Sequence, residues 1–176
     1  MKEIQRGFQR GLYILDLKAR DLSSIFHQVL NFLVSHEALP LEQREEVEKA
    51  LIKREEESPT TIGHATALPH LYLPSLKEPI VAFVRLERPL NLGAPDGIPT
   101  QFLFVLLGPT DSTAQHLDTL MNIARITSDD EFRYQLGVAK SRDELLAAFE
   151  DFQARTAAKL PVTEEQKPAE GLTFTG

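Results

Sequence analysis

Apolar residues recur at three- and four-residue intervals along much of the chain, as they do on the buried face of an amphipathic helix. Asp21 and Asp129 each precede such a stretch and are suitable N-caps, and Ser141 with Glu144 forms a capping box. Pro40 opens a further stretch whose early glutamates suit the positive end of a helix dipole. The pattern predicts helices over residues 21–36, 40–57, 112–126, 129–138 and 141–153.

Short apolar runs between these stretches predict strands. Residues 80–86 are rich in β-branched and aromatic side chains, and residues 101–107 are apolar on both faces, as in the centre of a sheet. Shorter runs predict strands at residues 12–15 and 62–68, and residues 71–74 predict a loop. This alternation predicts an α/β sandwich with a mixed four- to five-stranded sheet flanked by helices.

The chain of 176 residues is long enough for one domain. Residues 1–11 are mostly polar and predict a flexible N-terminus, whereas residues 12–154 hold the predicted strands and helices. From about residue 155 the composition turns polar and loses its periodicity, so residues 155–176 predict a tail or linker.

Composition argues against several classes of function. Lys and Arg total 19 against 26 Asp and Glu, a net charge of −7 with no basic stripe, so nucleic acid is not an expected partner. There is no cysteine to form a disulfide or a thiolate metal site, and the longest apolar run, residues 102–107, is far shorter than a membrane span. No Gly-rich phosphate loop is present, and no cofactor is predicted.

Candidate chemistry centres on residues 60–70, which end in Pro69 and His70. Proline ends a strand ladder, so His70 is expected on a loop at the edge of the sheet, where reactive groups collect in α/β folds. His116 lies in the first turns of the helix that follows strand 101–107. If that strand and the strand ending at Pro69 are parallel neighbours, the two histidines converge at one edge. His27 and His36 are expected on a solvated helix face, and His64 near the other end of its strand.

Two converging histidines leave three interpretations open. A metal pair has too few ligands, and no carboxylate is spaced to complete the site. A structural hydrogen-bonded pair is the second interpretation. The third is a phosphoryl relay, in which one imidazole nitrogen is the nucleophile, the other histidine donates to a phosphoryl oxygen, and Arg54 holds the charge.

The segment Arg54-Glu55, Thr60-Thr61-Ile62-Gly63 and Ala67-Leu68-Pro69-His70 resembles enzyme IIA of the fructose/mannitol type in the bacterial sugar phosphotransferase system. The resemblance continues through Asp96-Gly97-Ile98-Pro99, His116-Leu117 and the helix that begins at Ser141, over about residues 12–153. It implies that His70 is phosphorylated by phospho-HPr, that His116 is its partner and that Arg54 contacts the phosphate. The family usually has Gly after the reactive histidine, and this chain has Leu71.

The C-terminal half also resembles the cytoplasmic domain of the anion exchanger (band 3) family of bicarbonate transporters, which shares the enzyme IIA fold. The resemblance rests on residues 82–86, on residues 102–109 and on the final Leu172-Thr173-Phe174-Thr175-Gly176. It implies a regulatory or interaction domain on the cytoplasmic face of an inner-membrane protein, a homodimer attached to its own transmembrane domain. This is the first hypothesis for function, and the phosphoryl carrier is the alternative; whether the chain is an enzyme stays open between them.

Overall fold

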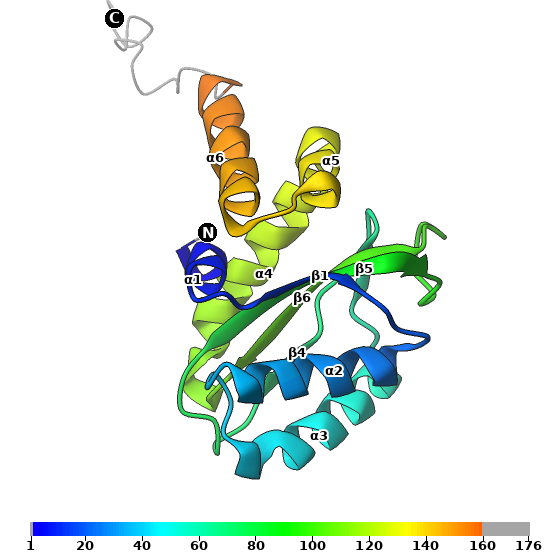
Figure 1. The fold of residues 1–176 in the computed structure, drawn as a ribbon, viewed down its shortest axis with the longest axis vertical. Coiled ribbons are helices and arrows are strands. Elements are labelled where there is room, and N and C mark those ends of the chain that lie inside the picture. Colours follow the sequence, from blue (N-terminus) through cyan, green and yellow to red (C-terminus); the bar gives the residue numbers. More distant parts are fainter. Residues whose placement is uncertain (1, 160–176) are drawn as a thin grey trace, which may run out of the picture.

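The computed structural model describes residues 2–159, which form a mixed sheet with helices on both faces (Figure 1). The strands are β1 (Tyr13–Leu17), β2 (Thr61–Gly63), β3 (Thr66–Ala67), β4 (His70–Tyr72), β5 (Ile80–Leu90) and β6 (Thr100–Gly108). Their order is β1-β5-β6-β3-β2, and β4 also pairs with β6. β5 runs antiparallel to β6, whereas β3 and β4 run parallel to it. The predicted fold class is confirmed, with six strands instead of four or five.

Two layers of helices cover the sheet. The helices are α1 (Lys2–Gln9), α2 (Leu22–Ser35), α3 (Arg44–Glu57), α4 (Thr113–Thr127), α5 (Asp130–Val138) and α6 (Arg142–Lys159), with short 3-10 turns at Leu41–Gln43 and Thr110–Ser112. Helices α2 and α3 lie on one face, and α1, α4, α5 and α6 on the other (Figure 1). Within residues 2–159, no helix is both long and apolar enough to span a bilayer.

Three of these helices begin where the sequence places their caps. The Asp21 side chain accepts a hydrogen bond from Ser24 N at 2.7 Å, and the Asp129 side chain accepts one from Phe132 N at 2.8 Å. At the start of α6, Ser141 Oγ accepts from Glu144 N at 3.2 Å.

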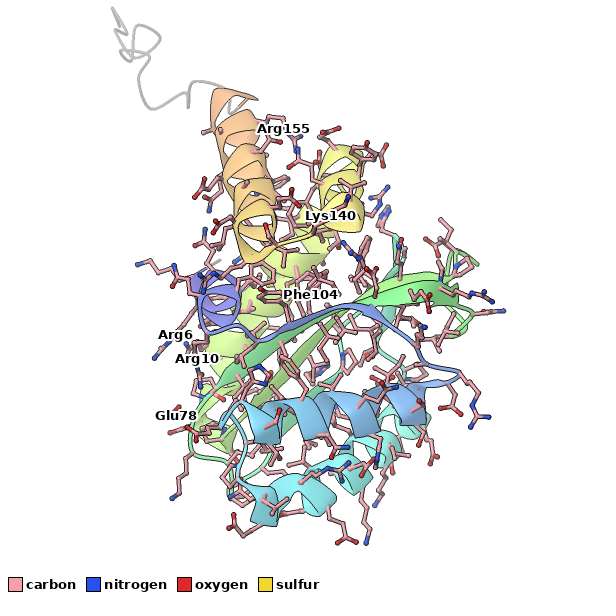
Figure 2. All side chains as sticks on the ribbon, in the orientation of Figure 1. Arg6, Arg10, Glu78, Phe104, Lys140 and Arg155 are labelled. Atoms are coloured by element: carbon pink, nitrogen blue, oxygen red, sulfur yellow. The ribbon has the colours of Figure 1, made fainter. Side chains whose placement is uncertain are left out.

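Strand β6 separates two hydrophobic cores because its residues alternate between the faces of the sheet. Leu103, Val105 and Leu107 pack with α2 and α3, while Phe102, Phe104 and Leu106 pack with the other helices. Figure 2 shows Phe104 between the sheet and the α1 and α4 layer. A strand buried on both faces fits the prediction that residues 101–107 are central.

The segment around residue 64 differs from the prediction of one strand over residues 62–68. Gly63, His64 and Ala65 have φ values of 87°, 53° and 57°, so a left-handed turn separates β2 from β3. β3 ends at Ala67, and after Leu68 and Pro69 the chain pairs with β6 again as β4, where a loop was expected. Period-two patterning could not show this, because a turn with positive φ shifts the facing of every later residue.

The N-terminus also differs from the flexible segment predicted over residues 1–11, since most of it is helix α1. Ile4 and Phe8 are each 1% exposed, and these buried side chains hold the polar helix against the sheet. At the other end, α6 continues to Lys159, into the predicted tail, and residues 160–176 of that tail lie outside the described part of the chain.

The buried guanidinium of Arg85 on β5 connects the sheet to the end of α5. Its Nη1 donates to Leu136 O at 2.9 Å and to Ala139 O at 2.6 Å, at the end of α5. Its Nε and Nη2 donate to the Asp16 carboxylate at 3.1 and 3.2 Å, and Asp16 holds a φ of 60°. The side chain therefore joins β5, β1 and α5.

We expect Arg85→Met to lower the free energy of unfolding by about 2–4 kcal/mol, because buried carbonyl oxygens lose their donors. Urea denaturation followed by circular dichroism measures the change. Arg88→Met, on the exposed end of the same strand, is the matched control and should leave stability within about 0.5 kcal/mol of wild type. Equal effects of the two substitutions would contradict the role given to Arg85.

Candidate functional site

His70 begins β4 and is held in one tautomer by its neighbours. Its Nδ1 lies 2.7 Å from Leu68 O, which can only accept, so Nδ1 carries the proton. Its Nε2 lies 2.6 Å from Arg54 Nη2, which can only donate, so Nε2 carries the lone pair. The half-buried imidazole is therefore neutral, with its basic nitrogen turned toward a guanidinium.

Arg54 and Glu55, near the end of α3, contact different parts of the segment that follows. Arg54 reaches His70, while the Glu55 carboxylate accepts from Thr60 N at 3.1 Å and from the Thr60 hydroxyl. The Glu55 contacts fix the path of the chain as it leaves α3 and enters β2. The two adjacent side chains thus hold opposite ends of residues 60–70.

The left-handed turn before β3 is held by Asp96. Its carboxylate accepts from His64 N at 2.8 Å and from Ile98 N at 3.0 Å, and these bonds lower the pKa of Asp96. A Cβ on Gly63 would lie 2.9 Å from the Asp96 carboxylate, so the close approach requires glycine. Asp96 thereby positions the strand that delivers Leu68 and His70 to the site.

His116 lies in the second turn of α4 and is fully buried. Neither of its ring nitrogens has a hydrogen-bond partner among the described residues. Gly108 at the end of β6 makes room for the ring, because a Cβ there would lie 3.2 Å from His116 Cε1 and 2.5 Å from Ser112 Oγ. Buried polar atoms without partners are rare and call for a functional explanation.

Tyr72 lies between the two histidines, a residue that sequence reasoning missed. Its ring centroid is 6.1 Å from that of His70 and 5.3 Å from that of His116. Its hydroxyl is buried without a partner in the part of the chain that the structure describes, and burial raises its pKa, which keeps it a donor. The available signal was its spacing of two residues from His70, which places both on one face of a strand.

Burial lowers the pKa of both histidines. For His70, the Leu68 carbonyl partly opposes the lowering, and the Arg54 charge adds to it. For His116, the Glu3 carboxylate opposes the lowering and His70 adds to it. Both rings are therefore neutral at pH 7.

The structure brings Arg54, His70 and His116 into one site and contradicts one of the three interpretations left open by the sequence. A hydrogen-bonded histidine pair is wrong, because His116 has no such partner. No group of three His, Cys, Asp or Glu side chains within residues 2–159 is arranged to hold a metal ion, and a guanidinium faces the free nitrogen of His70. A nucleophilic nitrogen, a cation and donors without partners form an arrangement that can accept a phosphoryl group.

The other histidines lie outside this site. His27 is on the exposed face of α2 and His36 is the exposed residue that caps its C-terminus, so both are solvated as the sequence predicted. His27 Nδ1 lies 3.1 Å from the Glu48 carboxylate. His64 is exposed in the left-handed turn, where its backbone contacts Asp96.

Comparison with known proteins gives matches over nearly the whole described chain. Residues 7–152 match the family described as phosphoenolpyruvate-dependent sugar phosphotransferase system, EIIA 2. A nitrogen regulatory protein of Pseudomonas aeruginosa is 31% identical over 87% of this chain and 98% of its own length. A nitrogen regulatory protein of Bradyrhizobium diazoefficiens is 35% identical over 52% of this chain and 60% of its own length. The crystal structure of nitrogen regulatory protein IIA-Ntr from Neisseria meningitidis has a TM-score of 0.73 at 28% identity, covering 82% of this chain and 97% of that one.

These matches correct the first functional hypothesis, a regulatory domain of a bicarbonate transporter. An electrogenic sodium bicarbonate cotransporter of Ambystoma tigrinum is 37% identical, but over only 44% of this chain and 8% of that protein. The Pseudomonas protein instead matches along its whole length. The resemblance to bicarbonate transporters is thus limited to part of this chain and a small part of that protein. The homodimer and the transmembrane domain were inferred from it, and no comparison supports them.

The lowered pKa values of the site histidines predict a loss of stability in acid. Each ring takes up a proton more readily in the unfolded chain than in the folded one. Above about pH 6.5 neither state is protonated and the histidines cost no stability, whereas the free energy of unfolding falls as pH drops below that value toward the folded pKa. Urea denaturation between pH 8 and pH 5.5 measures this slope. The slope should become shallower in His116→Gln and stay unchanged in His36→Gln. A slope unaffected by His116→Gln would contradict the prediction.

Proposed function

Because the chain belongs to the EIIA 2 family of the phosphoenolpyruvate-dependent sugar phosphotransferase system, we propose that it is a phosphoryl carrier whose acceptor atom is His70 Nε2. The observation that carries the proposal is the fixed tautomer of His70, with Nδ1–H bonded to Leu68 O and the lone pair of Nε2 beside Arg54. An imidazole that is neutral at pH 7 needs no further deprotonation to act as a nucleophile.

The transfer step balances without a proton exchange between the proteins. The Nε2 lone pair attacks the phosphorus of a phosphohistidine on the donor, and the donor's P–N bond breaks with its electron pair returning to that nitrogen. The Nδ1 proton stays in its bond to Leu68 O, and the donor ring keeps the proton on its other nitrogen. The ring of His70 then carries a positive charge, which the Leu68 carbonyl and the attached phosphoryl dianion stabilise.

Arg54, His116 and Tyr72 would receive the phosphoryl oxygens. Arg54 exchanges its hydrogen bond to Nε2 for one or two bonds to the phosphoryl group. Among the described residues, His116 and Tyr72 have donors without partners beside His70, so binding the phosphoryl group would satisfy these buried atoms.

An apolar surface beside the site supports a protein donor such as phospho-HPr. Leu117 and Met121 on α4 are 55% and 64% exposed, and Leu117 directly follows His116 in the chain. Exposed apolar side chains next to a reactive group favour docking of another protein. A related fold was solved as the complex of enzyme IIAMTL with phosphorylated enzyme IIBMTL from Escherichia coli, at 17% identity and a TM-score of 0.63.

The downstream role that we propose is regulatory. The relative matched along its whole length is named a nitrogen regulatory protein, whereas the fructose-specific EIIABC component of Bacillus subtilis is matched over only 20% of its length. A carrier of this kind would act through its phosphorylated and unphosphorylated states, because a phosphoryl group adds negative charge at an exposed apolar surface.

Phosphorylation of His70 is tested by incubating the chain with phosphoenolpyruvate, enzyme I and HPr and measuring intact mass. We expect a phosphate-sized gain that is lost in His70→Ala and retained in His36→Ala. Arg54→Gln should slow labelling by about 10²-fold or more, because an aligned cation is removed from the developing charge. Absence of labelling while HPr itself is labelled would contradict the proposal, as would labelling that persists in His70→Ala.

Docking on α4 is tested with Leu117→Glu and Met121→Glu. We expect either substitution to slow transfer from phospho-HPr by about tenfold or more, since a charge replaces an apolar contact at the centre of the interface. Tyr134→Glu on α5 is the matched control, because Tyr134 is also 64% exposed. Equal rates in all three variants would contradict docking on this face.

A further inference from the structure

Helix α1 lies against β5 and beside α4, on the His116 side of the sheet (Figure 1). Besides the buried Ile4 and Phe8, it contacts the sheet at Gly7, where a Cβ would lie only 2.3 Å from Val81 O. Any larger residue at position 7 would push the helix away, so glycine permits the closest approach. This packing fixes the backbone of α1 against the sheet.

The packing places the Glu3 side chain beside His116. The Thr119 hydroxyl, one turn after His116 on α4, donates a hydrogen bond to the Glu3 carboxylate. Glu3 and His116 also line one small cavity of about 30 Å³, together with Arg6, Arg10 and Gln115. The carboxylate is therefore held next to a buried imidazole whose nitrogens have no partner among the described residues.

The charges around His116 come from several elements. From α1, the Glu3 carboxylate favours the protonated ring. Arg6 on α1 and Arg10, just after α1, carry positive charge and line the same cavity, and both lie on one side of the molecule (Figure 2). From β4, His70 opposes protonation when it is charged, and Tyr72 stays neutral. Arg54 lies beyond His70. Glu3 is thus the carboxylate that faces His116 among the described residues lining this cavity.

We propose that Glu3 is a positioning residue for His116, holding the ring and stabilising its protonated form when a phosphoryl group occupies His70. The inference rests on the proposed function of His70 and adds a residue to it. As the phosphoryl dianion arrives, His116 takes up one proton from solvent and donates a charge-assisted hydrogen bond to a phosphoryl oxygen. It releases that proton when the phosphoryl group leaves.

Glu3 is outside the part of the chain that matches the family, which begins at residue 7. Its role is therefore inferred from the contacts of α1 in this chain. Burial disfavours a charged imidazole, and a carboxylate on the buried side of the ring offsets part of that penalty.

The first experiment is an NMR titration of the His116 ring nitrogens in the full chain. In Glu3→Gln, we expect the midpoint of His116 to lie at lower pH than in wild type, because the carboxylate no longer favours the charged ring. Asp118→Asn is the matched control: it removes the same charge from the exposed side of α4, two residues from His116, and should leave the midpoint unchanged. Thr119→Val keeps the Glu3 charge but removes its hydrogen-bond donor and should lower the midpoint as well.

The second experiment measures the rate of transfer from phospho-HPr against pH. Because transfer is proposed to need a protonated His116, the rate should fall at high pH. We expect this fall to begin at lower pH in Glu3→Gln, and transfer to be about tenfold slower at pH 8, where less His116 can be protonated. Asp118→Asn should follow the wild-type profile. A structural defect in Glu3→Gln would lower the rate equally at every pH.

The outcomes separate this inference from the proposed function. Failure of HPr to label the wild-type chain would overturn the carrier role, while the titration would still measure the link between Glu3 and His116. Labelling of wild type with identical His116 midpoints in wild type, Glu3→Gln and Thr119→Val would overturn the role of Glu3 alone. An equal shift in Asp118→Asn would also overturn it, since any nearby charge would then suffice.

Discussion

The parallel pairing of β4 with β6 determines the site. The register sets His70 opposite Leu106 and Tyr72 opposite Gly108, at the end of β6 from which the chain continues into α4. A shift by one residue would turn the imidazole to the other face and away from His116. Pro69 and the left-handed turn held by Asp96 precede β4 in the chain, and Gly108 leaves room for the His116 ring at the end of the paired segment.

Much of the fold could be predicted from the sequence because its signals are local. Helices α2, α4, α5 and α6 follow apolar periodicity and capping residues, and the central position of β6 follows from its apolar faces. The meeting of His70 and His116 could also be predicted, since the carboxyl ends of parallel neighbours share an edge. Arg54 was expected to hold the charge of a phosphoryl relay because it closes the helix before residues 60–70, the family resemblance implied the same contact, and the structure brings it to His70 Nε2.

The remainder depends on contacts between distant segments, which have no local signal. The burial of α1 comes from Ile4 and Phe8 meeting a sheet formed much later in the chain, so a polar-looking segment becomes ordered. The break at residue 64 depends on Asp96, 32 positions away. Tyr72 was missed because the loop expected at residues 71–74 hid its alternation with His70. The bicarbonate hypothesis was wrong because it rested on similarity over part of the chain, whereas the Pseudomonas relative matches over 98% of its own length.

The fixed tautomer of His70 restricts the route by which a group could reach its ring. One ring nitrogen is turned to its own backbone, so under the proposed carrier function a group on His70 would enter and leave only through the other nitrogen. Under that proposal, the protein that supplies the group and the protein that receives it would occupy the same surface in turn and would not bind together. The fraction of chains carrying the group would therefore reflect competition between the two partners for one docking position. It would rise with the supply of the donor and fall with the supply of the acceptor.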